Sequence, residues 1–233
     1  MQIFYSPSSP FVRKCLVTAK ELGCYDELEL LDSHAHPINR DQNILKKNPL
    51  AQVPTLINNK DESLFDSKVI CEYLNKHKKG TLFGDEDSKW EILKEHAIAD
   101  GIMATTVLLR IETQMRPAEL EWKELTNGHF DKICSSLNYF EESPESLTKP
   151  LNIAQITLAC ALAYLDFRLS YFEWKKDFPR LAEWFDCFNQ RPSMQSTQYT
   201  LMYWYDFFGQ SKRSIDLTRL IILLIKLHRS QII

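Results

Sequence analysis

The stretch Asn48-Pro49-Leu50-Ala51-Gln52-Val53-Pro54-Thr55-Leu56-Ile57 places a proline directly between a turn and an apolar run that has the character of a β-strand. Pro54 cannot donate a backbone hydrogen bond, so it belongs at the start or on the edge of a strand. A Val–Pro peptide at such an entry is a plausible place for a cis bond, although a trans proline is the commoner arrangement. The polar turn at 58–61 then predicts a hairpin into a second strand at 63–65.

Upstream of this stretch the chain alternates strand and helix signals. Residues 1–5 are apolar and aromatic and predict a strand, which the Ser- and Pro-rich residues 6–10 break. Apolar residues then recur every three or four positions over 11–22, which predicts a helix. Residues 28–31 predict another strand, and the polar residues 33–47 predict an irregular segment with one helical turn.

Downstream of the hairpin, Asp66 and Ser67 are good N-cap residues for a helix over 68–78. Residues 79–87 are polar, contain two glycines and predict a linker. Strand signals nearly vanish after it, and helical periodicity continues to about residue 190. We therefore expect a second, all-helical domain with helices at 88–114, 117–142, 153–169 and 178–190.

One of these predicted helices has a distinct start. Asn152 precedes it as an N-cap, and Gln155 stands at the third helical position, an arrangement related to the capping box. The run that follows, residues 156–165, is apolar almost all round, so we expect this helix at the centre of the helical domain.

Composition narrows the class of protein. The 233 residues are 44% hydrophobic and 25% charged, as in ordinary folded proteins, so we expect a water-soluble globular chain. A formal net charge of −3 argues against nucleic acid as a main partner. The start does not resemble a secretory signal, and the apolar stretch 220–227 is far shorter than the ~20 residues of a spanning helix. We expect a cytoplasmic protein that does not enter a membrane.

The six cysteines are scattered, without C-x-x-C or zinc-like spacing. We therefore expect reduced thiols and no metal. Cys15, Cys71 and Cys160 stand among apolar residues of helical stretches, which predicts structural thiols that behave as small hydrophobic side chains. The six are Cys15, Cys24, Cys71, Cys134, Cys160 and Cys187.

Three segments, residues 8–14, 48–56 and 65–74, resemble the glutathione transferase superfamily in their order and spacing. An all-helical half that ends in residues 178–184 follows, and the resemblance covers about residues 1–200. The start of the chain and residues 99–103 also resemble the bacterial YibF-type glutathione transferases.

The resemblance implies an α+β fold in two domains. A thioredoxin-like glutathione-binding domain, residues 1–78, contains a mixed four-stranded sheet with helices. A linker at 79–87 leads to an all-α helical-bundle domain at 88–200. The remaining residues, 201–233, form a C-terminal extension that the resemblance does not explain. It also implies glutathione as co-substrate, no metal, and a homodimer.

The resemblance further implies a set of glutathione-binding residues. A cis Val53–Pro54 peptide would turn the backbone outward, so that Val53 pairs with the cysteinyl part of glutathione like an added strand. Gln52 matches a position that reaches the glycyl carboxylate. Asp66 and Ser67 match positions that bind the γ-glutamyl end at a helix N-terminus, although the family more often has Glu or Gln before the serine. Such a pair can also be only a helix cap.

Catalysis in this family depends on a group near the sulfur of glutathione. Ser8 matches the serine of the serine-type classes, and Ser9 matches the cysteine of the thiol-transfer classes. Ser9 and Phe11 are also among the residues that the resemblance implies bind glutathione. A serine hydroxyl there can donate to the thiolate and lower a thiol pKa of about 8.5. The serines can equally cap the helix. Tyr5 is a third candidate, with a packing role favoured by its place in a strand.

The missing cysteine distinguishes between reactions. Without a nucleophilic thiol on the protein, disulfide exchange through an enzyme-bound mixed disulfide is disfavoured. Conjugation or isomerisation by bound glutathione thiolate is favoured instead.

Other polar residues lie near the predicted site. Arg13 and Lys14 fall in the first helical turns, and we expect the Lys14 side chain to be solvated. His36 and Asn39 lie in the loop that borders the pocket and are further candidates for ligand contact.

On the first long helix of the second domain, one face either lines the electrophile pocket or belongs to the core. Asp100 and Gly101 interrupt that helix, and a close approach of another helix or subunit is one explanation. The residues of the face are Met103, Val107, Arg110 and Met115.

We therefore predict a glutathione transferase that transfers the thiolate to a small hydrophobic electrophile. The alternative is a non-catalytic interaction protein on the same fold, resembling the stringent starvation protein A group that binds RNA polymerase.

Overall fold

The computed structural model describes residues 1–33 and 35–200, which belong to a single compact unit. The predicted C-terminal extension at 201–233 lies outside the described residues.

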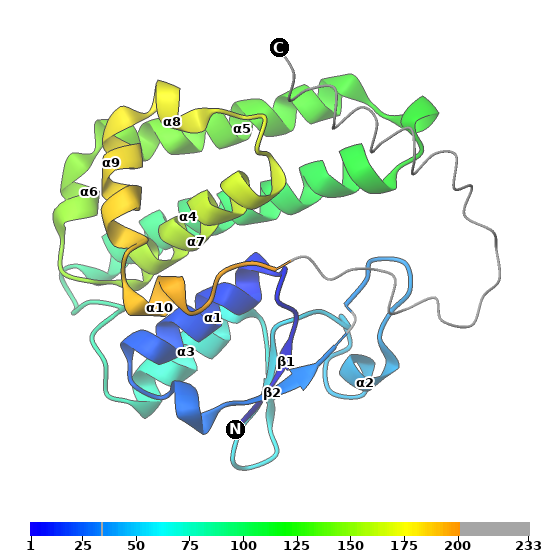
Figure 1. The fold of residues 1–233 in the computed structure, drawn as a ribbon. Helices are drawn as coiled ribbons and strands as arrows, with labels where there is room; N and C mark the ends of the chain where they lie inside the picture. Colours follow the sequence, from blue (N-terminus) through cyan, green and yellow to red (C-terminus); the bar gives the residue numbers. More distant parts are fainter. Residues whose placement is uncertain (34, 201–233) are drawn as a thin grey trace. The chain divides into compact units, whose positions relative to one another are not determined.

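The amino-terminal part contains a four-stranded mixed sheet with the order β2-β1-β3-β4 (Figure 1). Strand β1 (Gln2–Tyr5) is parallel to β2 (Glu29–Asp32) and antiparallel to β3 (Thr55–Ile57). The edge strand β4 (Ser63–Leu64) is antiparallel to β3. The predicted order of strands is confirmed, and so is the mixed sheet.

The register of this sheet brings distant segments together. Phe4 pairs with Thr55, and Leu56 pairs with Leu64. Strands β1 and β4 run in the same direction, and β3 runs against both. The last residues of β1 and β4 and the first residues of β3 therefore lie together where these strands end, and we call this end of the strands the edge of the sheet.

One face of the sheet packs on two helices. Side chains alternate between the faces of a strand, and Ile3 and Leu56 join the buried residues of α1 (Pro10–Glu21) and α3 (Ser67–His77). The two helices also pack against each other. This cluster extends into the helical part and forms the main core.

The opposite face of the sheet has a smaller cluster. There Phe4 and Ile57 pack around Ile44 of the short helix α2 (Gln42–Leu45). The predicted single helical turn in the polar segment is therefore present, and Ile44 is the residue that anchors it. A 3₁₀ turn, η1 (Tyr25–Glu27), precedes β2.

The second part is helical throughout. The predicted long helices correspond to α4 with η2, to η3 with α5, to α7 and to α9, whereas the short helices α6, α8 and α10 were not predicted. Four or five residues are too few to show an apolar period. The elements are α4 (Lys89–Arg110), the π-helical turn η2 (Ile111–Met115), the 3₁₀ turn η3 (Ala118–Leu120), α5 (Lys123–Glu142), α6 (Pro144–Thr148), α7 (Ile153–Arg168), α8 (Trp174–Asp177), α9 (Pro179–Phe188) and α10 (Pro192–Gln195).

Helix α7 is the central helix, as its apolar sequence predicts. It packs against both α4 and α1 and so connects the helical part with the sheet part. The Asn152 side chain caps it and accepts from the backbone N–H groups of Ala154 (3.0 Å) and Gln155 (3.1 Å). The Gln155 side chain does not complete a capping box: it donates to carbonyl oxygens of α6 (Pro144–Thr148) and to that of Lys149 in the loop after it, at 3.1 Å.

Candidate active site

The turn between β1 and α1 carries the predicted catalytic serines. Ser9 is the N-cap of α1, in an extended conformation, and its hydroxyl accepts from the Val12 N–H at 3.3 Å. A hydroxyl that accepts one hydrogen bond can still donate its own proton. Capping and donation to a bound thiolate are therefore compatible at Ser9. Phe11, in the first turn of α1, is half-buried and packs against the main core.

Ser8 lies in the turn itself and is half-buried. Its hydroxyl oxygen is 3.4 Å from that of Ser6. Tyr5, the last residue of β1, borders a small cavity of about 70 Å³ and packs against the core. Its carbonyl accepts from the Ser33 hydroxyl at 2.8 Å. Tyr5 thus has the packing contacts expected from its place in the strand.

The loop before β3 has the backbone form that the resemblance implies. The Val53–Pro54 peptide is cis. The carbonyl of Gln52 points into the loop, where it accepts from the Thr55 hydroxyl at 2.8 Å and the Asn48 amide at 3.3 Å. The Gln52 side chain is exposed. Within residues 1–33 and 35–200, no backbone hydrogen bond uses the N–H or C=O of Val53, so both groups remain for an added strand.

Helix α3 begins with the predicted capping pair. The exposed Asp66 is the N-cap, and its carboxylate accepts from the Lys68 N–H at 2.9 Å. Ser67, the first helical residue, is only 2% exposed. Its carbonyl accepts from the Cys15 thiol at 3.7 Å, which brings α1 and α3 together. The Ser67 side chain therefore lies beneath the surface, and its role in ligand binding stays a prediction.

A buried ionic network lies where these elements meet the helical part. The Lys14 side chain is 0% exposed, and its Nζ lies 2.6 Å from Oδ1 of Asp100 and 3.3 Å from Nε2 of His96. The other oxygen of Asp100 lies 3.3 Å from Nζ of Lys68. The expectation that Lys14 is solvated was wrong, because α1 is covered by α3 on one side and α7 on the other.

The network sets the charge of its members. Burial acts to raise the pKa of Asp100, but the Lys14 ammonium and then His96 and Lys68 lower it. Burial acts to lower the pKa of Lys14, but its neighbours, including Asp100, raise it. Burial and then the Lys14 ammonium lower the pKa of His96 to about 4. At neutral pH the network therefore contains two cations, one carboxylate and a neutral imidazole that accepts from Lys14.

Arg13, the neighbour of Lys14, ties α1 to the last described residues. Its guanidinium donates to the Met194 carbonyl at 3.0 Å and lies 4.5 Å from the ring centroid of Tyr199. The backbone N–H of Thr200 in turn donates to the Pro7 carbonyl at 3.3 Å. The segment after α10 therefore runs beside the serine turn, a contact that no local sequence signal could have indicated.

His36 and Asn39 order their own loop. Nδ1 of His36 accepts from the N–H groups of Ile38 (3.2 Å) and Asn39 (3.0 Å). The Asn39 side chain is exposed.

The described cysteines are free, and those predicted to be structural are buried. Sγ of Cys15 and Sγ of Cys71 lie 3.8 Å apart between α1 and α3. Burial raises the pKa of the Cys160 thiol to about 12. These thiols act as packing groups, whereas Cys187 is exposed.

The face of α4 predicted either to line the electrophile pocket or to belong to the core divides into two parts. Met103 is fully buried in the main core, whereas Val107 and Arg110, one and two turns further, are half-buried. A Cβ added to Gly101 would meet no described atom within 4 Å. No helix of the described chain therefore explains this glycine.

The three motif segments meet at one edge of the sheet. The serine turn follows the end of β1, Val53 and Pro54 precede β3, and Asp66 follows β4. This edge thus brings together two helix N-termini, an unpaired extended backbone and a set of hydroxyls. Such an arrangement suits an extended peptide-like ligand with an anionic end.

Comparison with known proteins gives the family. Residues 8–77 match the domain described as "Glutathione S-transferase, N-terminal domain", and residues 137–187 match "Glutathione S-transferase, C-terminal domain". The chain belongs to the glutathione S-transferase family. Among its relatives is the "Uncharacterized GST-like protein YibF" of Escherichia coli (strain K12), 31% identical over 203 residues that cover 85% of this chain and 98% of the relative.

Solved structures of glutathione transferases superpose on this chain and support the same family assignment. A glutathione transferase family member from Pseudomonas fluorescens Pf-5, with bound glutathione, is 37% identical and superposes with a TM-score of 0.83, covering 86% of this chain and 99% of that one. A second structure from the same organism contains S-(propanoic acid)-glutathione, with 37% identity, a TM-score of 0.79 and coverage of 86% and 100%. A glutathione S-transferase from Methylobacillus flagellatus KT with glutathione bound is 27% identical, with a TM-score of 0.77 and coverage of 85% and 99%.

The described residues contain neither a spanning helix nor a metal-binding cluster. No helix in residues 1–33 and 35–200 is both long and apolar enough to cross a membrane. The same residues contain no group of three or more His, Cys, Asp or Glu side chains placed to bind a metal ion.

Proposed function

We propose that this chain binds glutathione at the sheet edge formed by the serine turn, the Val53–Pro54 loop and the start of α3, and transfers its thiolate to a small, largely apolar electrophile. The observation that carries the proposal is the unpaired backbone of Val53 beside two helix N-termini. One relative of 37% identity has been solved with glutathione and with a conjugate substituted on its sulfur, which supports both the ligand and the reaction.

The backbone of glutathione would add to the edge of the sheet. Val53 offers one donor and one acceptor to the cysteinyl unit, and the exposed Gln52 side chain is the candidate partner of the glycyl carboxylate.

The γ-glutamyl end carries one ammonium and one carboxylate, and the start of α3 offers a partner for each. Asp66 is exposed and supplies an acceptor for the ammonium. The first N–H groups of α3, with the hydroxyl of Ser67, supply donors for the carboxylate. Lys14 and Lys68 both pair with Asp100, so neither lysine takes the Asp66 carboxylate as an ion-pair partner.

Activation of the thiol would come from Ser8 or Ser9 together with the N-terminal amides of α1. A hydrogen bond and a helix dipole directed at the sulfur favour the thiolate over the thiol. Ser9 lies next to the N-terminal amides of α1, because its hydroxyl caps that helix by accepting from Val12. The Ser8 hydroxyl does not cap the helix. The serine that donates to the sulfur would be the catalytic residue.

The test is a calorimetric titration of the full chain with glutathione, combined with the ultraviolet absorbance of the thiolate. Ser8→Ala and Ser9→Ala are compared with Ser136→Ala, a half-buried serine of α5 whose hydroxyl donates to the Lys132 carbonyl within the same helix. We expect binding with a thiolate signal in the wild type and the Ser136 control, and loss of that signal in one of the two turn variants. Absence of binding at millimolar glutathione would overturn the proposal and favour the non-catalytic interaction protein.

We also infer a cytoplasmic homodimer. Gly101 on α4 has open space around it, and Val69 on α3 and Trp90 on α4 are exposed apolar side chains, 44% and 73% respectively. Light scattering tests the assembly: a dimer has twice the 27.3 kDa mass of the chain, and a monomeric mass at all concentrations would contradict it.

A further inference from the structure

A cavity of about 270 Å³ is lined by residues of α1, α7, α9 and the segment after α10. Two of its lining residues, Asp166 and Gln198, are exposed, so the cavity opens to solvent. Among its described lining residues, none belongs to the proposed glutathione site. They are Arg13, Ala163, Asp166, Phe167, Phe185, Asn189, Gln198 and Tyr199.

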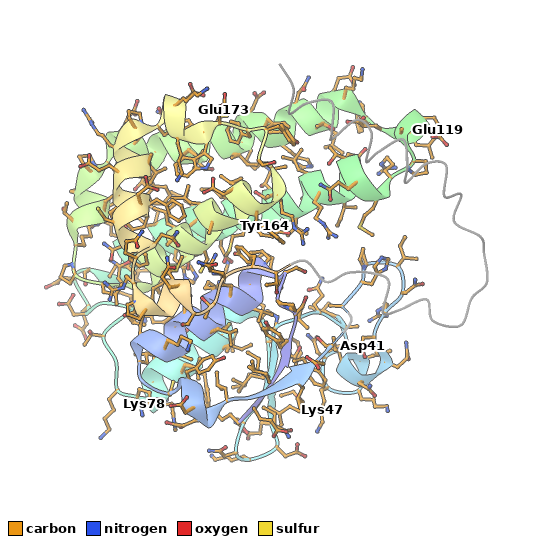
Figure 2. The ribbon with its side chains drawn as sticks, viewed as in Figure 1. Asp41, Lys47, Lys78, Glu119, Tyr164 and Glu173 are labelled. Atoms are coloured by element: carbon orange, nitrogen blue, oxygen red, sulfur yellow. The ribbon has the colours of Figure 1, made fainter. Side chains whose placement is uncertain are left out.

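One wall of this cavity is a pair of stacked aromatic rings. The ring centroids of Phe167 and Tyr199 lie 5.1 Å apart, with the planes inclined by 17°. Tyr199 also meets Tyr164 edge-on at 5.4 Å, and Figure 2 shows Tyr164 on the side of α7 that faces the amino-terminal half. The Tyr199 hydroxyl donates to the Cys160 carbonyl at 2.9 Å. The wall is therefore held in place by the protein itself, which lowers the entropic cost of binding a ligand against it.

Arg13 lines the same cavity as a buried cation. It is only 4% exposed. Its guanidinium donates to the Met194 carbonyl at 3.0 Å and to the Thr197 hydroxyl at 3.5 Å, and both of these oxygens are neutral. None of the ion pairs between the described residues includes Arg13, whereas its neighbour Lys14 has Asp100 at 2.6 Å. A cation removed from water without an opposite charge is costly.

The described groups around Arg13 do not supply that opposite charge. Burial raises the pKa of the Tyr199 phenol well above 10.0 and that of the Cys160 thiol to about 12, so both groups are neutral. The Tyr199 ring centroid lies 4.5 Å from Cζ of Arg13, and such a cation–π contact offsets only part of the cost. The Asp166 carboxylate accepts from the indole N–H of Trp174 at 2.8 Å and is exposed, so water screens its charge.

The size and chemistry of the cavity indicate the kind of ligand. An apolar cavity of about 150 Å³ holds benzene, so a cavity of about 270 Å³ has room for a benzene ring and a carboxylate. A carboxylate fits the planar fork of an arginine and would supply the charge that Arg13 lacks. The ring would pack on Phe167 and Tyr199. Asn189 also lines the cavity, and its amide can donate to the same carboxylate.

We propose that this cavity binds a small aromatic carboxylate, with the carboxylate on Arg13 and the ring against the Phe167–Tyr199 wall. The site is separate from the glutathione site and goes beyond the proposed function, because it needs neither glutathione nor a reaction. Arg13 is a binding residue for the acid.

The test compares three probes that share one ring. Benzoate carries a negative charge, benzamide is its neutral counterpart, and benzylamine is a cation at neutral pH. The Kd of each is measured by calorimetry on the full chain without glutathione. We expect benzoate to bind about tenfold or more tighter than benzamide, the effect of a hydrogen-bonded charge. Benzylamine is expected to bind no better than benzamide.

Two variants separate the charge from the space. Arg13→Gln removes the charge, and the ratio of the benzamide Kd to the benzoate Kd is expected to fall to about one. Arg13 also ties α1 to the Met194 carbonyl, so a second variant leaves that tie intact. Ala163→Leu fills the cavity from α7 and is expected to weaken benzoate binding about tenfold or more. Its control is Ala97→Leu, the same change at an exposed position of α4, which is expected to leave the Kd unchanged.

Several outcomes would overturn the proposal. Equal Kd values for benzoate and benzamide in the wild type, or tighter binding of benzylamine, would show that Arg13 does not set the charge of the site. A preference for benzoate that persists in Arg13→Gln, or full affinity in Ala163→Leu, would place the ligand elsewhere. Benzoate binding that requires saturating glutathione would assign the acid to the electrophile pocket. Failure of glutathione itself to bind would overturn the proposed function and leave this site standing.

Discussion

His96 gives the folded protein a specific sensitivity to mild acid. Burial and then the Lys14 ammonium lower its pKa to about 4, from an ordinary value of 6.5. As the pH falls through 6.5, the unfolded chain takes up a proton on this residue while the folded chain does not. Stability is therefore fully present above pH 6.5 and is lost progressively as the pH falls toward 4.

The size of the loss follows from the same two values. They differ by about 2.5 pKa units, and each unit corresponds to about 1.36 kcal/mol of unfolding free energy. By pH about 4.5, the loss from this residue reaches roughly 2 to 3 kcal/mol. His96 is only 3% exposed, so solvent screening reduces this value little.

The assay is urea unfolding at a series of pH values between about 7.5 and 4.5 for the wild type and His96→Gln. A glutamine amide can accept from Lys14 but does not titrate. We expect the wild type to lose roughly 2 to 3 kcal/mol more than the variant across this range. His129→Gln, a half-exposed histidine of α5, is the control and is expected to behave as the wild type does.

Equal pH dependence in the wild type and His96→Gln would refute this reasoning. It would mean that His96 titrates in the folded chain as it does in the unfolded one, and that the network does not exclude its proton. Glu21 also titrates in acid, because its hydrogen bond with Arg191 lowers the pKa of its carboxyl. The stability that Glu21 contributes is therefore lost at lower pH, and it is lost equally in the wild type and in His96→Gln.

Three further predictions concern single side chains. Asp100→Asn leaves the Lys14 ammonium buried without its carboxylate, and we expect a loss of about 3 to 5 kcal/mol in urea unfolding; a loss below about 1 kcal/mol would show that the pair is not desolvated. Ser9→Ala removes the cap of α1 and is expected to cost about 1 kcal/mol, whereas Ser8→Ala stays within about 0.5 kcal/mol; equal costs would contradict the capping assignment. A thiol reagent is expected to modify Cys187 before any buried cysteine, as peptide mass spectrometry can check, and the reverse order would mean that the core opens readily.

Local signals were sufficient for most of the fold. Pro54 at a strand entry, the Ser- and Pro-rich break after Tyr5 and the caps at Asp66 and Asn152 each act within a few residues, so the sequence alone indicates where the elements begin. The cis Val53–Pro54 bond came from the family resemblance, since the common trans form fits the same letters.

Contacts between distant residues could not be predicted in this way. Lys14 follows Arg13 on an amphipathic helix, and two adjacent cations normally indicate a solvated face. Both are buried because α1 has neighbours on either side, and their partners lie more than eighty residues away along the chain. The cavity between α7 and α9 that Arg13 lines is likewise a property of the packed structure and of no motif.

The adjacent cations Arg13 and Lys14 have a consequence for how such a protein can change over evolutionary time. Lys14 depends on Asp100 of α4, and Arg13 depends on Met194 and Tyr199 near the other end of the described chain. A chimera that joins this amino-terminal half to the helical half of a relative would inherit two buried cations without their acceptors. The halves are therefore not interchangeable modules, and substitutions at positions 14 and 100 are expected to succeed only as a matched pair.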